Sequence, residues 1–163
     1  MLSPKATATV LVMKPSLNHL IATYKRHADY LMSFHYNKGG ISANVVFDLL
    51  GEINKKMEAL RVFRNVVSVA YSHLGKREKE VIKYLFFNGY DCKQVMKKMD
   101  MTAPIFDVYV RRAFKKFSDT VCILGFDDER LIKYFNLEPL FIDSARIAVK
   151  RFFEEGSNGA KIN

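Results

Sequence analysis

Apolar residues recur at spacings of three and four along most of the chain, which is the period of an amphipathic helix. The spacing predicts one helix from Ser16 to about Tyr36 and a longer one from Ser42 or Asn44 to His73. At 1.5 Å per residue the longer helix would span about 45 Å, so it needs a partner along its length. The first helix can cover its first half as an antiparallel hairpin. Its second half must pack on the following helices or on another chain.

The stretch from Leu74 to Phe117 predicts three short helices in succession. The first covers about 76–87 and ends at Asn88-Gly89, because both residues tolerate a left-handed backbone. Asp91 is suited to cap the second helix, and Thr102 the third, which covers about 103–117. Each cap has a helper residue in the sequence: Gln94 as the reciprocal half of a capping box, and Pro104 in a first turn.

The ends of the chain complete an all-α prediction, since few β signals occur. Residues 1–14 are predicted to be a mobile segment, with an extended strand over 7–13 as the alternative. The third helix either stops near Phe117 or extends through 118–124, and two shorter helices follow, one after Asp127 and one from Pro139. The predicted division is a mobile segment at 1–14, a helical hairpin at 15–73, a three-helix region at 74–120, C-terminal helices at 121–155 and a flexible tail at 156–163.

Composition and charge limit the kind of partner. The 163 residues are 49% hydrophobic and 26% charged, which is typical of a globular domain. Lysine and arginine total 26 against 17 acidic residues, giving a net charge of +9. This excess favours a polyanionic partner, with nucleic acid first and a membrane surface second. Two cysteines make no disulfide framework, and neither a signal peptide nor a membrane span is recognisable, so a cytoplasmic protein is expected.

Two helices joined by about three residues, with the second ending in a basic run, have the pattern of a helix-turn-helix. An ungapped series of residues adds to this pattern: Leu74, Arg77-Glu78, Glu80-Val81-Ile82, Gly89, Val95, Met101-Thr102 and Arg111-Arg112-Ala113-Phe114-Lys115-Lys116-Phe117. The series resembles region 4 of bacterial sigma factors, the part that docks on the −35 promoter element, and it covers about a quarter of the chain. Two positions depart from the family pattern, since Met96 stands where the family has alanine and Asp100 where it has glycine.

The resemblance implies a transcription regulator that binds double-stranded DNA and contacts RNA polymerase. It places the base-reading positions at Ala103, Pro104, Asp107 and Val108. None of these side chains can donate the pair of hydrogen bonds by which arginine recognises guanine. Asp107 would repel phosphate unless it accepts a hydrogen bond from a cytosine amino group. The third helix closes with four cations, and the helix before it carries more, which we expect to contact phosphates. The predicted DNA-binding residues are Thr102, Ala103, Asp107, Val108, Arg111, Arg112, Lys115, Lys116, Lys93 and Lys97.

Each of these assignments has an alternative. The cations also suit a solvated helix end, where they complement the helix dipole. The base-reading positions, which are mostly apolar, equally fit a protein–protein module that binds polymerase or another regulator without reading DNA. The chain lacks a counterpart of region 2, which opens promoter DNA, so we expect a regulator and not a complete sigma factor. No enzyme signature, cofactor motif or metal-ligand spacing is found. The long helix over 44–73 could pair two chains as a homodimer, or be satisfied within one.

Overall fold

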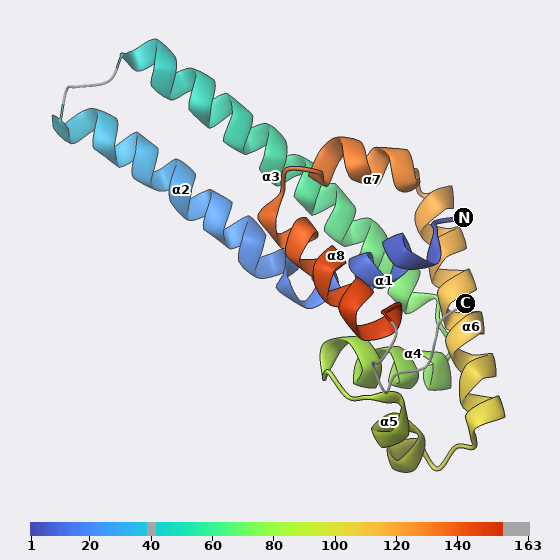
Figure 1. Cartoon of the computed structure of the whole chain (residues 1–163). Coiled ribbons are helices and arrows are strands. Elements are labelled where there is room, and N and C mark those ends of the chain that lie inside the picture. The colour runs from blue at the N-terminus through green and yellow to red at the C-terminus, as the bar shows by residue number, and fades with distance from the viewer. Residues whose placement is uncertain (39–41, 155–163) are drawn as a thin grey trace. The chain divides into compact units, whose positions relative to one another are not determined.

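The structure describes residues 1–38 and 42–154, and helices joined by short connections make up most of them. This computed structural model contains eight α-helices in those residues, with a 3-10 turn (Lys14–Ser16) after the first and a π-helical turn (Lys83–Phe87) after the fourth (Figure 1). The predicted all-α class is therefore confirmed. The chain divides into two compact units, of which one is Ser16–Asn65 and the other joins Met1–Pro15 to the chain from Val66 onward.

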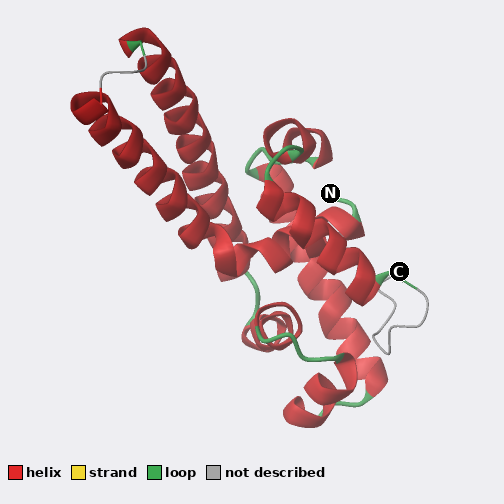
Figure 2. Ribbon diagram, turned by 60° about the vertical axis from the view of Figure 1, so that its left-hand side comes forward, coloured by secondary structure: helices red, strands yellow, loops and turns green. Residues whose placement is uncertain are grey.

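Two antiparallel helices make up the unit Ser16–Asn65, namely α2 (Leu17–Lys38) and the larger part of α3 (Ala43–Ser72) (Figure 2). Ala28 of α2 is buried in one cluster with Ile53 and Met57 of α3. Around this cluster pack three half-buried residues, Tyr24, Leu31 and Leu50.

The long helix that the sequence predicted is α3, which runs without a break through Gly51. A Cβ added at Gly51 would meet no atom within 4 Å. The glycine costs some helix stability but causes no kink here. The first helix was predicted to end at about Tyr36, and α2 instead continues to Lys38, while Gly39-Gly40 of the predicted break lie outside the described residues.

The prediction for the start of the chain was wrong. Residues 1–14 were expected to be a mobile segment or an extended strand, and the structure instead has a helix, α1 (Pro4–Met13). Its side chains are buried nearly all round, with Ala8, Val10 and Leu11 fully inaccessible. A helix buried on every side has no polar stripe, so its sequence shows no helical period.

Local signals for α1 are nevertheless present in the sequence. Ser3 is the N-cap, its hydroxyl accepting from the N–H of Ala6 at 3.2 Å, and Pro4 follows in the first turn. Thr7 and Thr9 are β-branched and buried, which would ordinarily disfavour a helix. Their hydroxyls donate to the carbonyl oxygens four residues back, at 3.0 and 2.8 Å, so no buried hydroxyl is left unsatisfied there.

Three other elements of this unit pack against α1. They are α8 (Pro139–Phe152), the π-helical turn and α6 (Ala103–Ile123). The Ser118 hydroxyl of α6 donates to the Leu2 carbonyl at 3.3 Å, and the N–H of Ser3 donates to the Asp128 carboxylate of α7 (Asp128–Phe135) at 3.1 Å. The N-terminal segment is thus held by both of these helices.

The predicted short helices are present near their predicted bounds. The first is α4 (Lys76–Ile82), continued by the π-helical turn to Phe87, and the next is α5 (Cys92–Met99). Gly89, between them, has a φ of +74°, as expected of a left-handed stop. Arg151 of α8 donates to the Leu85 and Tyr90 carbonyls at 3.0 and 3.4 Å.

The remaining bounds differ in detail. Helix α6 extends to Ile123, so the predicted division between 120 and 121 falls inside a helix. Asp127 caps α7 as predicted, accepting from the N–H of Arg130 at 2.8 Å. The predicted flexible tail, 156–163, lies outside the described residues. Among the helices described, none is long and apolar enough to cross a bilayer.

Candidate DNA-binding surface

The candidate surface is built by α5 and α6, which are joined by the three residues Asp100–Thr102. The predicted capping box at the start of α5 is confirmed, because the N–H of Gln94 donates to Asp91 Oδ1 at 2.8 Å and the N–H of Asp91 donates to Gln94 Oε1 at 3.0 Å. Asp100 ends α5 with a φ of +50°. This aspartate therefore adopts the left-handed conformation for which glycine is the usual choice.

Helix α6 starts after Thr102, which occupies the N-cap position as predicted. Pro104 lies in its first turn. The Thr102 side chain makes no capping hydrogen bond, however, so only its position and not its expected hydroxyl contact is confirmed. Thr102 is exposed, and its hydroxyl is not engaged in a cap at the start of α6. It can therefore donate to a phosphate oxygen.

All four residues that the resemblance places at base-reading positions are exposed in the first two turns of α6. Ala103, Pro104 and Asp107 are exposed, and Val108 is 39% exposed. The structure adds Ile105, which is 49% exposed and which sequence reasoning did not include. One signal could have found Ile105, since it lies off the apolar stripe that Phe106, Val110 and Ala113 carry into the core. The front of α6 is therefore mostly aliphatic.

Three cations follow on the exposed side of α6, namely Arg111, Arg112 and Lys115. Arg111 Nε donates to the backbone carbonyl of Asp107 at 3.4 Å, a long bond that engages one edge of the guanidinium. Arg111 and Lys115 are one turn apart, so their like charges repel. An anion placed between them would relieve that repulsion. We refer to Arg111, Arg112 and Lys115 as the cationic row.

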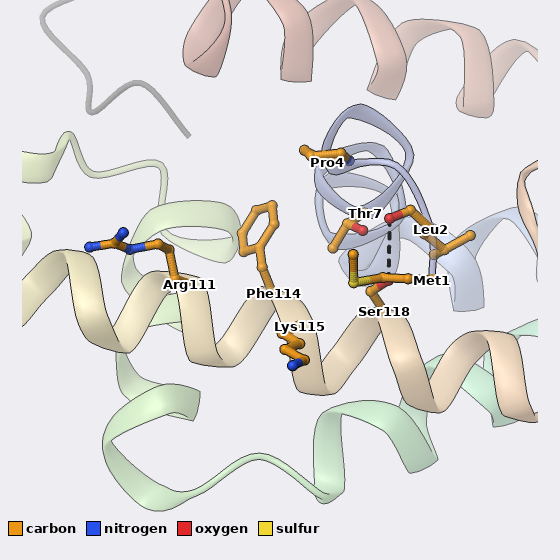
Figure 3. A pocket seen from close by; sticks show the side chains of 8 residues that line it. All are labelled: Met1, Leu2, Pro4, Thr7, Arg111, Phe114, Lys115 and Ser118. Carbon is orange, nitrogen blue, oxygen red and sulfur yellow. Dashed lines mark hydrogen bonds between the residues drawn. The ribbon is translucent and has the colours of Figure 1, made fainter. Parts of the chain in front are cut away.

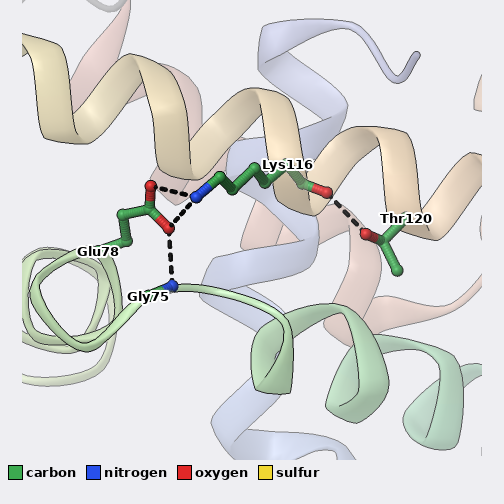
Figure 4. A network of polar contacts seen from close by, with 4 residues as sticks. All are labelled: Gly75, Glu78, Lys116 and Thr120. Atoms are coloured by element: carbon green, nitrogen blue, oxygen red, sulfur yellow. Dashed lines mark hydrogen bonds and ion pairs between the residues drawn. The ribbon is translucent and has the colours of Figure 1, made fainter.

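Lys116 has a different role from its neighbours (Figure 4). Its Nζ donates to both carboxylate oxygens of Glu78 on α4, at 2.8 and 3.0 Å. Glu78 Oε2 also accepts from the N–H of Gly75 at 2.7 Å. The Glu78 side chain is only 6% exposed, so this ion pair ties α6 to α4 across their interface. These contacts give Glu78 a structural role at the interface of α4 and α6.

The environment of Glu78 keeps it ionised. Burial raises the pKa of the Glu78 carboxyl, but the hydrogen bonds from Lys116 and Gly75, with the charges of Lys116 and Arg112, outweigh burial and leave that pKa below its usual value. The carboxylate therefore holds Lys116 at neutral pH. Arg112 remains exposed above this pair and acts on it through space.

Helix α5 contributes further positive charge. Lys93 and Lys97, the two residues predicted to contact the flanking backbone, are both exposed. Lys98 instead lies over two aromatic rings, with its Nζ 5.3 Å from the centroids of both Tyr84 and Tyr90. The two rings are stacked on each other at 5.7 Å. All three lysines are exposed, and Lys93 and Lys97 are the two without such a ring contact among those described.

A pocket of about 270 Å³ lies between the start of the chain and α6 (Figure 3). Its walls are largely apolar, and two members of the cationic row stand at its edge. The start of the chain thus packs against the buried side of α6 at Phe114 and Ser118, while Arg111 and Lys115 stay exposed. The lining residues are Met1, Leu2, Pro4, Thr7, Arg111, Phe114, Lys115 and Ser118.

Other reactive side chains do not gather into a second centre. Cys92 is buried in the first turn of α5, and Cys122 is half-buried near the end of α6. Within 1–38 and 42–154, the His, Cys, Asp and Glu side chains form no group of three that could hold a metal ion.

Comparison with known proteins adds nothing to this geometry. No protein-family model, curated protein or solved structure matches the chain.

Proposed function

We propose that this chain binds double-stranded DNA, with α5 and α6 acting as a helix-turn-helix and α6 docking in the major groove over about 103–117. Three features support the proposal. The connection between the two helices is short, the first turns of α6 are exposed, and the chain carries a net charge of +9. In this arrangement α5 lies across the phosphate backbone, where Lys93 and Lys97 contact it.

The cationic row is the observation that carries the proposal. Arg111, Arg112 and Lys115 are exposed on the helix whose front is also exposed. A structural explanation accounts for Lys116, which holds Glu78, and in part for Arg112, whose charge also acts on Glu78, but it does not extend to Arg111 or Lys115. Phosphate contact gives each of them a partner and sets the register of α6 on the duplex.

The resemblance to sigma region 4 extends the proposal to transcription. The chain would act as a regulator that contacts RNA polymerase while α6 is on DNA. Exposed apolar residues on α3, among them Val45, Leu49 and Val62, would support pairing of two chains along that helix. Sedimentation of the purified protein over a range of concentrations would test the homodimer, since only a dimer dissociates on dilution.

A fluorescence anisotropy titration on mixed-sequence duplexes, repeated across salt concentrations, tests DNA binding. Affinity should fall steeply with salt, because each neutralised phosphate releases counterions. The double variant Arg111→Gln/Arg112→Gln should lower the slope of log affinity against log salt by about 1.8, from roughly 0.9 per phosphate contact.

The matched control is Arg146→Gln on α8, which removes an exposed arginine paired only with exposed Asp143. It should fold and bind like the wild type, because an exposed ion pair contributes little to stability and α8 is not part of the candidate surface. Equal losses for each charge removed in the two variants would mean that overall charge, and not the cationic row, governs binding. Absence of any salt-dependent binding would refute the proposed function.

The second candidate is a protein–protein module that binds polymerase or another regulator without DNA. The aliphatic front of α6 favours it, since Ile105 and Val108 are exposed where hydrogen-bonding side chains would be expected in a DNA reader. Binding to purified RNA polymerase that is insensitive to salt, together with no binding to duplexes, would select this candidate.

A further inference from the structure

The start of α6 is an apolar tip, by which we mean Ala103, Pro104, Ile105 and Val108. Ile105 and Val108 are 49% and 39% exposed, and the other two are also exposed. Ile105 and Val108 stand three residues apart, so their side chains neighbour each other on the helix surface. Both are among the exposed large hydrophobic residues of the chain, although many of the α6 side chains around them are buried.

The chemistry of the apolar tip limits which bases it could read. None of its side chains donates or accepts a hydrogen bond, so it cannot distinguish guanine or adenine by their polar edges. The major groove presents one apolar feature, which is the C5-methyl group of thymine. Contact between this methyl and an aliphatic side chain removes both from water, which is favourable.

Charge next to the apolar tip decides which way it faces on a duplex. Asp107 lies between Ile105 and Val108 in the sequence and is exposed, and its carboxylate would be repelled by phosphates. The tip therefore favours the base edges over the backbone, where Asp107 can accept from a cytosine amino group. One turn further along the same side, Arg111 and Arg112 bring positive charge.

The spacing along α6 fits this arrangement. From Ala103 to Arg112 the helix rises about 14 Å at 1.5 Å per residue, against a major groove about 12 Å wide. With the first two turns on the base edges, the third turn reaches the wall of the groove. Arg111 and Arg112 then contact phosphates and fix the register in which the apolar tip meets the bases.

From these observations we infer that Ile105 and Val108 are specificity-determining residues that recognise the C5-methyl groups of neighbouring thymines, so that the preferred sites are thymine-rich. This inference rests on the proposed function. Asp107 adds a preference for a cytosine beside the thymines. The recognition is by shape and apolar contact, and the cationic row supplies the affinity.

The test begins with selection of duplexes from a random pool by the full chain, which should enrich sites with adjacent thymines on one strand. The selected duplex is then compared with the same sequence in which deoxyuridine replaces each thymine. Only the methyl groups differ, so the loss should be about fourfold for each methyl contacted and roughly 16-fold for two. The dependence of affinity on salt should stay unchanged, because the phosphates are the same.

Variants connect the effect to the apolar tip. Ile105→Ala/Val108→Ala should bind the thymine and uracil duplexes with nearly equal affinity, since the side chains that would contact the methyls are shortened. The matched control is Ile123→Ala, an aliphatic residue in the last turn of α6 that is 83% exposed. It should keep the full preference for thymine over uracil.

The outcomes separate this inference from the proposed function. Equal affinity of the wild type for both duplexes, with a steep salt dependence, overturns methyl recognition and leaves DNA binding intact. No salt-dependent binding to any duplex overturns both. If the apolar-tip variant loses polymerase binding in the absence of DNA and the wild type shows no thymine preference, the tip is a protein-docking site, which also overturns the inference.

Discussion

The buried ion pair between Glu78 and Lys116 makes a prediction about acid stability. Glu78 lies at the α4–α6 interface with its side chain 6% exposed, and it accepts three hydrogen bonds, two from Lys116 Nζ and one from the N–H of Gly75. The perturbation is Glu78→Gln, which keeps the shape of the side chain but removes its charge. The neutral amide can still accept from Gly75, while the charge-assisted bonds to Lys116 are lost.

The magnitude follows from the exposure of the two partners. A hydrogen bond to a charged group contributes about 1.5–3 kcal/mol when both groups are well buried. The Lys116 side chain is 53% exposed, so solvent screens the pair and the value must be reduced. We expect Glu78→Gln to lower the free energy of unfolding by about 1–2 kcal/mol at neutral pH. Lys116→Met should cost at least as much, because it leaves the buried carboxylate with fewer donors.

The sign of the pH dependence follows from the pKa of Glu78. Burial raises this pKa, but the hydrogen bonds and the nearby positive charges more than compensate, so it lies below the ordinary value of 4.5 in the folded chain. Between the two pKa values the unfolded chain binds more protons, and stability rises with pH there. The contribution of Glu78 is therefore complete above about pH 4.5 and disappears as the pH falls through the lower, folded value.

Urea denaturation followed by circular dichroism at several pH values between 7 and 3 measures this effect. The difference in unfolding free energy between wild type and Glu78→Gln should be largest at pH 7 and should shrink below about pH 4.5. Glu80→Gln is the control, since Glu80 is 37% exposed and its contact with Arg77 is 3.7 Å long. If wild type and Glu78→Gln lose stability in parallel as the pH falls, the folded carboxyl does not have a lowered pKa and the reasoning fails.

Two further predictions concern the folded state alone. Leu11→Ala, in a fully buried position of α1, should lower the free energy of unfolding by about 2–5 kcal/mol. Val12→Ala, at a half-buried position of the same helix, should lower it by less. Equal, small losses of stability in both variants would mean that α1 is not part of the core. Gly51→Ala should stabilise the chain by about 0.4–1 kcal/mol, whereas Gly89→Ala should destabilise it by about 1 kcal/mol or more. An added Cβ atom would meet no neighbouring atom at either site, but only Gly89 has a positive φ, which a residue with a side chain rarely adopts. Denaturant midpoints measure both pairs, and two glycine variants that shift in the same direction would contradict the second prediction.

Sequence reasoning located those helices that have a polar side. The amphipathic stripe of α3 and the caps at Asp91 and Asp127 gave element bounds close to the observed ones. These signals are local, since a cap is a side chain bonding to a backbone N–H three residues away. A stripe likewise reports that one face meets the core and the other meets water.

The same reasoning failed at α1 because burial on all sides removes the periodic signal. A short run of apolar residues and threonines does not indicate by itself whether it forms a helix, a strand or a tail. Only the long-range contacts of Leu2 with Ser118 and of Ser3 with Asp128 place it. These pairs are separated by more than a hundred residues, so the cap signal at Ser3-Pro4 was the one local feature that sequence reasoning could have used.

The four basic residues that were predicted to close the candidate helix lie in the middle of α6, which continues to Ile123, and they show a further limit of sequence reasoning. They look alike in the sequence, yet Lys116 alone has a partner on α4, while Arg111, Arg112 and Lys115 face solvent. Removing Lys116 should therefore weaken the packing of α6 on α4 and reduce stability, as worked out above for its partner. Removing Arg111, which does not act on Glu78, should leave the fold intact and change the salt dependence of binding. Stability and salt dependence measured on one variant of each kind thus separate a cation that positions α6 from cations that would contact a phosphate.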